Sequence, residues 1–199
     1  MVLELKSIYK KYNSEIFKDF SYIFKKNNIY FLRGKNGSGK TTLLKLIKGI
    51  YLIDDGQIIF DNNLSQKNDV AYINGNFRTF FHRLTIRQNL EYFFSLQSRS
   101  NNLNLINDLL GFFNISNLEH KTFSTLSQGQ MQIVSLIRGF LSEPKIILLD
   151  EVFSSLDKTN KKKVFKYVTD IISHEETLVI FTSHEEKIYG KEIKELCLS

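Results

Sequence analysis

The sequence predicts an α/β protein built on a parallel β-sheet. A glycine-rich loop at residues 34–39 joins a short apolar run, residues 29–32, to a segment with helical periodicity. Two further runs of four apolar residues, 146–149 and 178–181, show no polar alternation, as is typical of strands buried on both faces of a parallel sheet. A strand, a glycine loop and a helix in succession, followed by buried strands, predict a core in which helices cover a parallel sheet.

The 199-residue chain suits one domain, since its composition of 42% hydrophobic and 24% charged residues is that of a globular protein. No apolar run approaches the roughly 20 residues of a membrane-spanning helix, and the N-terminus does not resemble a signal peptide. We therefore expect a cytosol-like compartment, unless a partner holds the chain on a membrane. The single cysteine, Cys197, excludes an intramolecular disulfide and a C-x-x-C metal site. The net charge of +6 is scattered along the chain, which is typical of a solvated surface.

Residues 2–32 alternate partly between apolar and polar positions, which predicts short strands joined by polar turns. Tyr12 can stack its ring on a purine base held beside the glycine loop, because every base offers a π-face. Tyr9 is the second candidate for that role. Either ring can equally be a half-buried strand tyrosine.

The glycine loop fits the pattern G-x-x-x-x-G-K-[ST], and we name it the phosphate loop. Its residues are Gly34, Lys35, Asn36, Gly37, Ser38, Gly39, Lys40, Thr41 and Thr42. Backbone N–H groups of such a loop and the helix that follows it form an anion site. Lys40 is placed to reach the β- and γ-phosphates of a nucleotide, and the Thr41 hydroxyl to ligate Mg²⁺. The alternative is a glycine turn before an ordinary helix, which the strand before the loop and the helix after it disfavour.

The next part of the chain changes from strands to helices. Its hydrophobic pattern predicts strands at residues 57–60 and 70–73, a helix starting within 84–90, and helices at 103–113 and 127–141. Thr85 is the expected N-cap of the first of these helices, because its hydroxyl can accept a hydrogen bond from the first turn. Residues from Asn74 to about Ser142 are therefore expected to form a mostly helical insertion between strands of the core.

Beyond Pro144, the buried run at 146–149 ends on two carboxylates, Asp150 and Glu151. The carboxyl ends of strands are where open α/β sheets place their ligands. A helix is predicted at residues 161–172, and the strand at 178–181 ends close to His184.

Four sequence blocks occur in a fixed order: the phosphate loop, residues 126–130, residues 146–151 with 154–157, and His184. Together they resemble the nucleotide-binding subunit of ABC transporters across nearly the whole chain. The resemblance implies a P-loop NTPase core with a parallel sheet, an N-terminal antiparallel β part and an inserted helical subdomain. It implies one domain over residues 1–199, with a catalytic core at 1–73 and 144–199 and a helical subdomain at about 74–143. ATP and Mg²⁺ are the implied cofactors.

The resemblance also assigns roles at the carboxyl ends of the strands. Asp150 is expected to hold Mg²⁺ directly or through water, and Glu151 to act as the general base on the attacking water. His184 is expected to contact the γ-phosphate. The alternatives are that Glu151 only caps the strand end and that His184 is an ordinary strand-end histidine.

The second block contains the signature motif, which we define as Ser127, Gln128, Gly129 and Gln130. In the family, the serine and glycine of this motif bind the ATP held by a facing subunit, from a helix N-terminus. Gln128 stands where the family usually has glycine, so its side chain is expected near the nucleotide. Asp157 is expected at the seam between the two subunits.

The family carries a glutamine that touches Mg²⁺ and the membrane partner, after the strand that corresponds to residues 70–73. This chain has no glutamine there, because residues 74–77 are Asn, Gly, Asn and Phe. Asn76 or Asn74 is the expected substitute, with a shorter reach. We therefore expect the difference to affect coupling and turnover rather than ATP binding.

These features predict an ATPase that drives transport through a separate transmembrane permease, working with a second ATPase subunit on the cytoplasmic face of a membrane. Residues 78–90 are similar to a segment of some exporters, which favours export. The haem-exporter subunit of cytochrome c maturation is the alternative within the family. Two other classes compete: a soluble ABC-type ATPase acting on nucleic acid or ribosomes, and a degenerate nucleotide-binding module. The chain has neither the long coiled-coil insertion nor the zinc ligands common in the first class, so nucleic acid is not the expected partner. It retains Lys40, Asp150, Glu151 and His184, which argues against the second.

Overall fold

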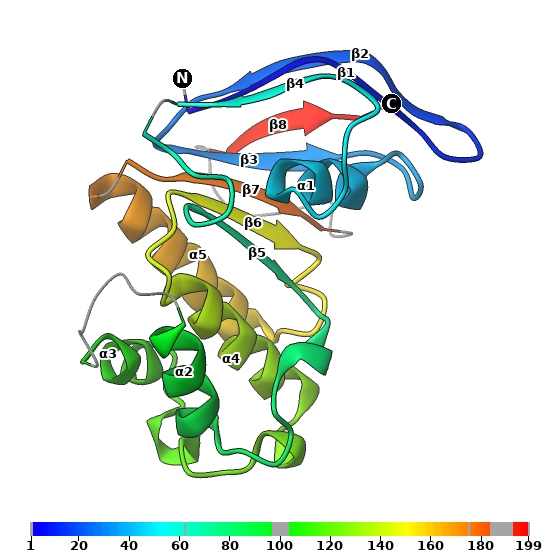
Figure 1. Cartoon of the computed structure of the whole chain (residues 1–199). Coiled ribbons are helices and arrows are strands. Elements are labelled where there is room, and N and C mark those ends of the chain that lie inside the picture. The colour runs from blue at the N-terminus through cyan, green and yellow to red at the C-terminus, as the bar shows by residue number, and fades with distance from the viewer. Residues whose placement is uncertain (1, 62, 97–103, 175, 184–192, 199) are drawn as a thin grey trace.

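The computed structural model describes residues 2–61, 63–96, 104–174, 176–183 and 193–198. Two sheets form its framework (Figure 1). Strands β1 (Leu3–Lys11), β2 (Glu15–Phe24) and β4 (Asp55–Phe60) make an antiparallel sheet in the order β2-β1-β4. The second sheet is parallel, with the order β5-β6-β7-β3-β8; its strands are β3 (Asn28–Arg33), β5 (Val70–Asn74), β6 (Ile146–Asp150), β7 (Leu178–Thr182) and β8 (Ile193–Cys197). The predicted α/β class, with a parallel sheet and an antiparallel β part, is confirmed.

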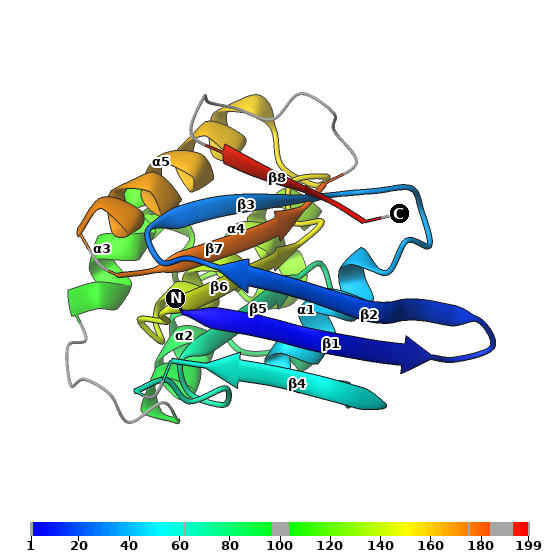
Figure 2. The ribbon, with the colours of Figure 1, turned by 90° about the horizontal axis from the view of Figure 1, so that it is seen from above.

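Helices cover both faces of the parallel sheet. They are α1 (Lys40–Lys48), α2 (Ile86–Ser95), α3 (Asn104–Phe112), α4 (Gln128–Phe140) and α5 (Lys158–His174), with 3₁₀ turns η1 (Phe77–Thr79), η2 (Ser116–Leu118) and η3 (Phe123–Thr125). Helix α1 lies between the two sheets, whereas α2 to α5 lie on the opposite side of the parallel sheet (Figure 1). Seen from above, the antiparallel strands pass over the parallel sheet (Figure 2).

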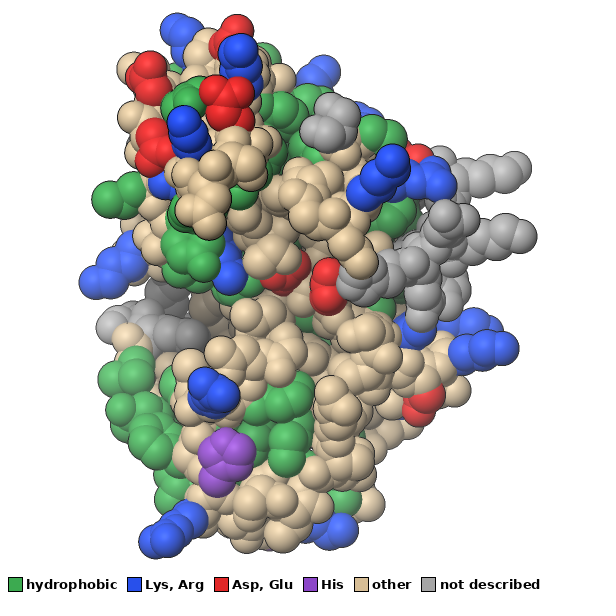
Figure 3. Space-filling view, turned by 90° about the vertical axis from the view of Figure 1, so that its right-hand side faces the viewer, with side chains coloured by type: hydrophobic (Ala, Val, Ile, Leu, Met, Phe, Trp, Pro, Cys, Tyr) green, Lys and Arg blue, Asp and Glu red, His purple; other side chains and the backbone are tan. Residues whose placement is uncertain are grey.

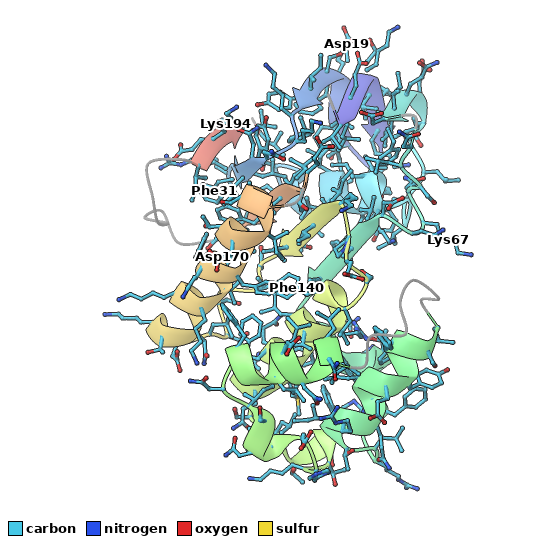
Figure 4. All side chains as sticks on the ribbon, turned by 90° about the vertical axis from the view of Figure 1, so that its left-hand side faces the viewer. Asp19, Phe31, Lys67, Phe140, Asp170 and Lys194 are labelled. Atoms are coloured by element: carbon cyan, nitrogen blue, oxygen red, sulfur yellow. The ribbon has the colours of Figure 1, made fainter. Side chains whose placement is uncertain are left out.

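Successive side chains of the buried strands point to opposite faces of the parallel sheet, so the core forms two clusters, one on each face. Tyr30 and Leu32 of β3 face α1 and the antiparallel sheet, and Phe31 faces the helical side, where it stacks on Phe181 with ring centroids 5.0 Å apart. Phe140 of α4 lies in the helical cluster, below the sheet that carries Phe31 (Figure 4). Burial on both faces explains why β6 and β7 are fully apolar up to their last residue.

Helix α4 approaches the sheet edge closely at Gly139. A Cβ atom on Gly139 would lie 2.3 Å from Cδ1 and 2.6 Å from Cγ1 of Ile73 on β5. Only a glycine allows this separation, because such distances are well inside van der Waals contact. The contact fixes α4, whose N-terminus carries the signature motif, relative to the strand that leads to the loop at 74–76.

Most predicted elements are confirmed, with small differences in their bounds. Thr85 is the N-cap of α2, and its side chain and that of Gln88 form a reciprocal capping box. Strands β1 and β2 are longer than the short strands expected, with 9 and 10 residues. Strand β8 was not expected, because its residues are half-exposed at a sheet edge and show no continuous apolar run. No helix within the described ranges is long and apolar enough to cross a membrane.

The parallel topology brings the ends of four strands to one edge. In register, Asp150 at the end of β6 is the pairing partner of Asn74 on β5 and of Thr182 on β7, and Thr182 pairs with Leu32 on β3. The phosphate loop begins directly after β3. Polar residues from segments far apart in the chain therefore lie together at this edge of the parallel sheet.

Candidate functional site

The phosphate loop turns from β3 into α1 through backbone conformations that favour glycine. Gly37 and Gly39 have φ angles of 85° and 89°, in the left-handed region, and Gly39 occupies the N-cap position of α1 without a side-chain cap. The first turn of α1 therefore presents backbone N–H groups to the loop interior rather than to a capping side chain. The Lys40 ammonium, 8% exposed, donates to the carbonyl oxygens of Gly34 at 2.7 Å and Lys35 at 3.0 Å.

The loop has the properties of an anion site. It borders a cavity of about 300 Å³, lined by Asn36, Gly37, Gly39, Lys40, Thr41, Thr42 and Glu151. The Ser38 hydroxyl inside the loop is buried and has no hydrogen-bond partner. A buried ammonium, an unpartnered hydroxyl and free N–H groups at a helix N-terminus are donors that fit phosphate oxygens.

Asp150 is the centre of a cluster of hydroxyl groups. Its Oδ1 atom accepts hydrogen bonds from the Thr41 and Thr182 hydroxyls, each at 2.9 Å, and its Oδ2 atom accepts from the Tyr72 hydroxyl at 2.7 Å. The carboxylate is 7% exposed. A carboxylate and a hydroxyl in contact are hard oxygen ligands of the kind that Mg²⁺ prefers, so Thr41 and Asp150 fit the metal role predicted for them.

Sequence reasoning did not find Tyr72 or Thr182. The pKa of Tyr72 is raised above its usual value, first by burial and then by the hydrogen bond to Asp150. The phenol therefore stays protonated and remains a donor at physiological pH. Thr182 connects the cluster to Glu151, because its Oγ1 atom also accepts a hydrogen bond of 3.0 Å from the Glu151 backbone N–H.

Glu151 has a strained backbone with a φ angle of 55°, in a region that non-glycine residues rarely adopt. It lines both the cavity at the phosphate loop and a second cavity of about 520 Å³ that Thr41 and Asp150 border. Strain of this kind is concentrated at functional sites. Its position between the two cavities suits the general-base role predicted for Glu151.

The loop after β5 lines the second cavity through Asn74, Gly75 and Asn76. Asn76 is exposed, and its Oδ1 atom accepts a hydrogen bond of 3.1 Å from the Arg78 N–H as the N-cap of η1. Asn74 Oδ1 accepts one of 3.1 Å from the Asn76 N–H. Both asparagines therefore lie at the cavity that Asp150 borders, and Asn76 uses its amide oxygen as a local cap.

A glutamine does reach this loop, from α4. Gln132 is 1% exposed, and its Nε2 atom has no hydrogen-bond partner. Its Oε1 atom lies 3.7 Å from where a Cβ on Gly75 would be. The sequence could not single out Gln132, because only the tertiary packing shows that an interior position of α4 faces the loop.

The signature motif begins α4. Ser127 is the N-cap, and its side chain and that of Gln130 form a reciprocal capping box. A Cβ on Gly129 would lie 3.0 Å from the Ser155 carbonyl oxygen, so glycine permits close packing onto the loop after β6. Gln128 is exposed. Ser127 and Gln130 thus have a structural task within their own chain besides the binding role predicted for the motif.

Three other predicted residues lie apart from this cluster. Tyr12 is 50% exposed, and its ring stands edge-on to Tyr51 with centroids 6.2 Å apart. Tyr9 donates its hydroxyl to Glu15 at 3.1 Å. Asp157 accepts hydrogen bonds from the N–H and side-chain amide of Asn160 in the first turn of α5. His184 lies outside the described residues.

A third cavity, which we name the β5 groove, runs along the outer edge of the parallel sheet. It has a volume of about 640 Å³ and is lined by Lys48, Lys67, Asn68, Val70, Ala71, Tyr72, Phe93, Leu96, Arg138, Gly139 and Ser142. The Arg138 guanidinium lies 4.1 Å from the Phe80 ring centroid and 4.8 Å from that of Phe93. Burial lowers the pKa of Arg138 to about 10, which still leaves it charged at physiological pH.

Charge is not concentrated on the face where the strands end. Figure 3 looks onto this face, where Lys and Arg side chains are dispersed around a central region that holds Asp and Glu side chains. Proteins that bind nucleic acid through phosphates gather Lys and Arg into a patch or stripe. This face has no such patch among the described residues.

Comparisons with known proteins agree with this geometry. The family model described as ABC transporter matches residues 17–154. The zinc import ATP-binding protein ZnuC of Rickettsia bellii is 31% identical over 92% of this chain and 76% of its own length. The ABC transporter ATP-binding protein YtrB of Bacillus subtilis is 29% identical over 92% of this chain and 63% of its own.

Solved structures agree as well. A putative ABC transporter ATP-binding protein from Pyrococcus furiosus superposes with a TM-score of 0.83 at 27% identity, covering 100% of this chain and 98% of its own. A dimeric ATP-binding cassette bound to ADP and Pi shares the fold, with a TM-score of 0.80 at 20% identity over 92% of this chain and 88% of its own. The phosphate loop, the carboxylates that follow β6 and the matching family model and relatives lead to one conclusion: the chain belongs to the ABC transporter family, as an ATP-binding subunit with ATPase activity.

Proposed function

We propose that this chain uses its ATPase activity to power transport through a separate transmembrane permease. The observation that carries the proposal is the convergence of the phosphate loop, Asp150 and Glu151 at one edge of the parallel sheet. A nucleotide triphosphate bound there has its phosphates on the loop and its terminal phosphate toward the carboxylates.

In this proposal Lys40 and the loop N–H groups bind the β- and γ-phosphates, and Thr41 and Asp150 hold Mg²⁺. The metal ion supplies charge neutralisation of the phosphate oxygens. Lys40 exchanges its present carbonyl acceptors for phosphate oxygens, which carry more negative charge and form stronger hydrogen bonds. Glu151 accepts a proton from the attacking water.

A second ATPase subunit completes the site. Ser127 and Gly129 of that subunit face the γ-phosphate from the N-terminus of α4, where the helix dipole favours an anion. Gln128 and Asp157 lie at the same seam. The exposure of Ser127 and Gln128 leaves this end of α4 accessible to a facing nucleotide. Tyr12, half-exposed, is the proposed stacking partner of the base.

The β5 groove is the proposed docking place of the permease. Its lining includes Tyr72, Phe93 and Arg138, and aromatic residues and Arg are enriched at protein interfaces. Leu96 in the lining is 62% exposed, and Phe81, whose ring centroid is 6.2 Å from that of the lining residue Phe93, is 44% exposed, so both add apolar surface. Docking there holds the chain at the cytoplasmic face of the membrane as a peripheral subunit. The helical segment at about 74–143 acts as the subdomain that the permease moves.

The relatives change our expectation for the direction of transport. We expected export from residues 78–90, but the named relatives include proteins for zinc, molybdate or tungstate, and sulfate or thiosulfate import. These relatives do not support an exporter, and the haem-exporter alternative has no further support. All of them are transport proteins, which favours a permease over nucleic acid as the partner.

The test is nucleotide binding by Lys40→Ala. We expect a loss of at least roughly a hundredfold in ATP affinity by isothermal titration calorimetry, since a buried charge-assisted contact to phosphate is removed. Lys45→Ala is the matched control: Lys45 lies on the same helix, and its ammonium lies against the Tyr51 ring rather than the loop. Parent-like affinity in Lys40→Ala would contradict the proposed site.

A further inference from the structure

We propose that Tyr72 is a positioning residue that fixes the Asp150 carboxylate for Mg²⁺. The inference rests on the proposed function, because it assigns a task within the same ATP site. Tyr72 is not among the residues assigned above to phosphate binding, metal binding or proton transfer, and it belongs to β5 rather than to the phosphate loop or to β6.

Tyr72 and the two threonines donate hydrogen bonds to different oxygens of Asp150. Thr41 and Thr182 both donate to Oδ1, and Tyr72 donates to Oδ2 at 2.7 Å. Within the described part of the chain, this is the hydrogen bond made to Oδ2. Two donors on one oxygen and one on the other prevent the carboxylate from rotating about its Cβ–Cγ bond.

Metal binding leaves Tyr72 in its role. The Thr41 hydroxyl, the proposed metal ligand, can bind Mg²⁺ through an oxygen lone pair and still donate its hydrogen to Oδ1 of Asp150, as Thr182 does. Tyr72 remains the donor to Oδ2. Removal of the Tyr72 hydroxyl would leave the carboxylate held from one side, and a loosely held ligand loses entropy when the metal fixes it.

Packing of the Tyr72 side chain and pairing of its strand both hold the phenol in place. Tyr72 is half-buried beside the cluster that contains α1, and its strand is paired in register with β6, so that residues 72 and 148 are partners. Asn74 Nδ2 lies 3.5 Å from the Tyr72 hydroxyl oxygen, a long contact that contributes less than the bond to Asp150. Since Tyr72 also lines the β5 groove, it connects the proposed permease surface with the metal site through a single side chain.

The experiment compares ATP binding in excess Mg²⁺ with ATP binding in EDTA, by isothermal titration calorimetry. Tyr72→Phe removes only the hydroxyl. We expect its affinity for ATP in EDTA to remain within about twofold of the parent, and the gain on adding Mg²⁺ to fall roughly tenfold, the usual size for loss of a hydrogen bond to a charged group. Asn74→Ala should reduce the gain by less, in line with its longer contact.

Tyr22→Phe on β2 is the matched control, because Tyr22 packs against the rings of Phe24 and Tyr30 away from the site. It should keep the parental gain. Electron paramagnetic resonance with Mn²⁺ in place of Mg²⁺ gives a second measure that needs no turnover: Tyr72→Phe with ATP should bind Mn²⁺ more weakly than the parent.

Two results overturn the inference. The first is a parental Mg²⁺ gain in Tyr72→Phe. The second is an equal loss of affinity with and without Mg²⁺, because that would show general damage to the site rather than positioning of a metal ligand. Failure of the parent itself to bind ATP would instead refute the proposed function, so the two failures are distinguishable.

Discussion

The contact between α4 and β5 makes Gly139→Ala a sharp test of the packing that holds the signature helix. The new methyl group would lie 2.3 Å from Cδ1 and 2.6 Å from Cγ1 of Ile73, which is 2% exposed and has little room to move. Overpacking of this kind costs about 1–3 kcal/mol. The gain in helix propensity offsets at most about 1 kcal/mol of it. With that offset subtracted, we expect a net loss of about 0–2 kcal/mol in the free energy of unfolding.

Gly111→Ala provides the matched control on α3. A Cβ there meets no atom within 4 Å, so the same substitution changes propensity without a clash. It should leave stability unchanged or raise it by about 0.5–1 kcal/mol. Urea unfolding with linear extrapolation measures both variants, provided that the slope stays constant. If Gly139→Ala proves as stable as Gly111→Ala, the close approach of α4 to β5 is wrong.

A double-mutant cycle identifies the side chain that causes the loss. Ile73→Ala removes both Cγ1 and Cδ1, and by itself costs about 2–5 kcal/mol as a cavity in the core. In the double variant the methyl group introduced at position 139 enters part of that space, so the two costs should not add. A coupling energy of about 1–3 kcal/mol in the favourable direction is expected. Additive costs would show that Gly139→Ala is destabilised by something other than a clash with Ile73.

The remaining predictions concern the chemistry. Glu151→Gln should bind ATP and lose hydrolysis, because an amide cannot accept a proton; ATP should then hold two subunits together in size-exclusion chromatography, and hydrolysis at the parental rate would exclude Glu151 as the base. Ser127→Arg should keep monomer binding of ATP but prevent ATP-dependent dimerisation, with Ser127→Ala as a milder control for the lost N-cap; equal loss of monomer binding would place Ser127 in its own subunit's site. Asn76→Gln should raise basal ATPase activity and reduce stimulation by the permease, whereas Asn76→Ala should lower both; parental rates in Asn76→Ala would remove this residue from the metal site.

Much of the fold could be predicted from local patterns. The phosphate loop, the helix starts at Thr85 and Ser127, and the buried strands β6 and β7 each depend on residues close together in the chain. Capping, glycine conformations and apolar runs act over a few residues, so the sequence displays them directly. Strand β8 escaped prediction because an edge strand with a half-exposed pattern carries little of this local signal.

The candidate site divides in the same way. The sequence by itself determined which groups are available for phosphate and metal chemistry: the ammonium of Lys40, the hydroxyl of Thr41 and the carboxylates of Asp150 and Glu151, all within recognisable local motifs. It could not determine which other groups hold them. Tyr72 and Asp150 are 78 residues apart, and they meet only because β5 and β6 pair in parallel and in one register. Thr182 reaches Asp150 through the same kind of pairing with β7, and Gln132 reaches the loop at Gly75 only through the packing of α4. Contacts across a sheet depend on strand order and register, which are set by burial of the whole core, so only the tertiary structure decided them.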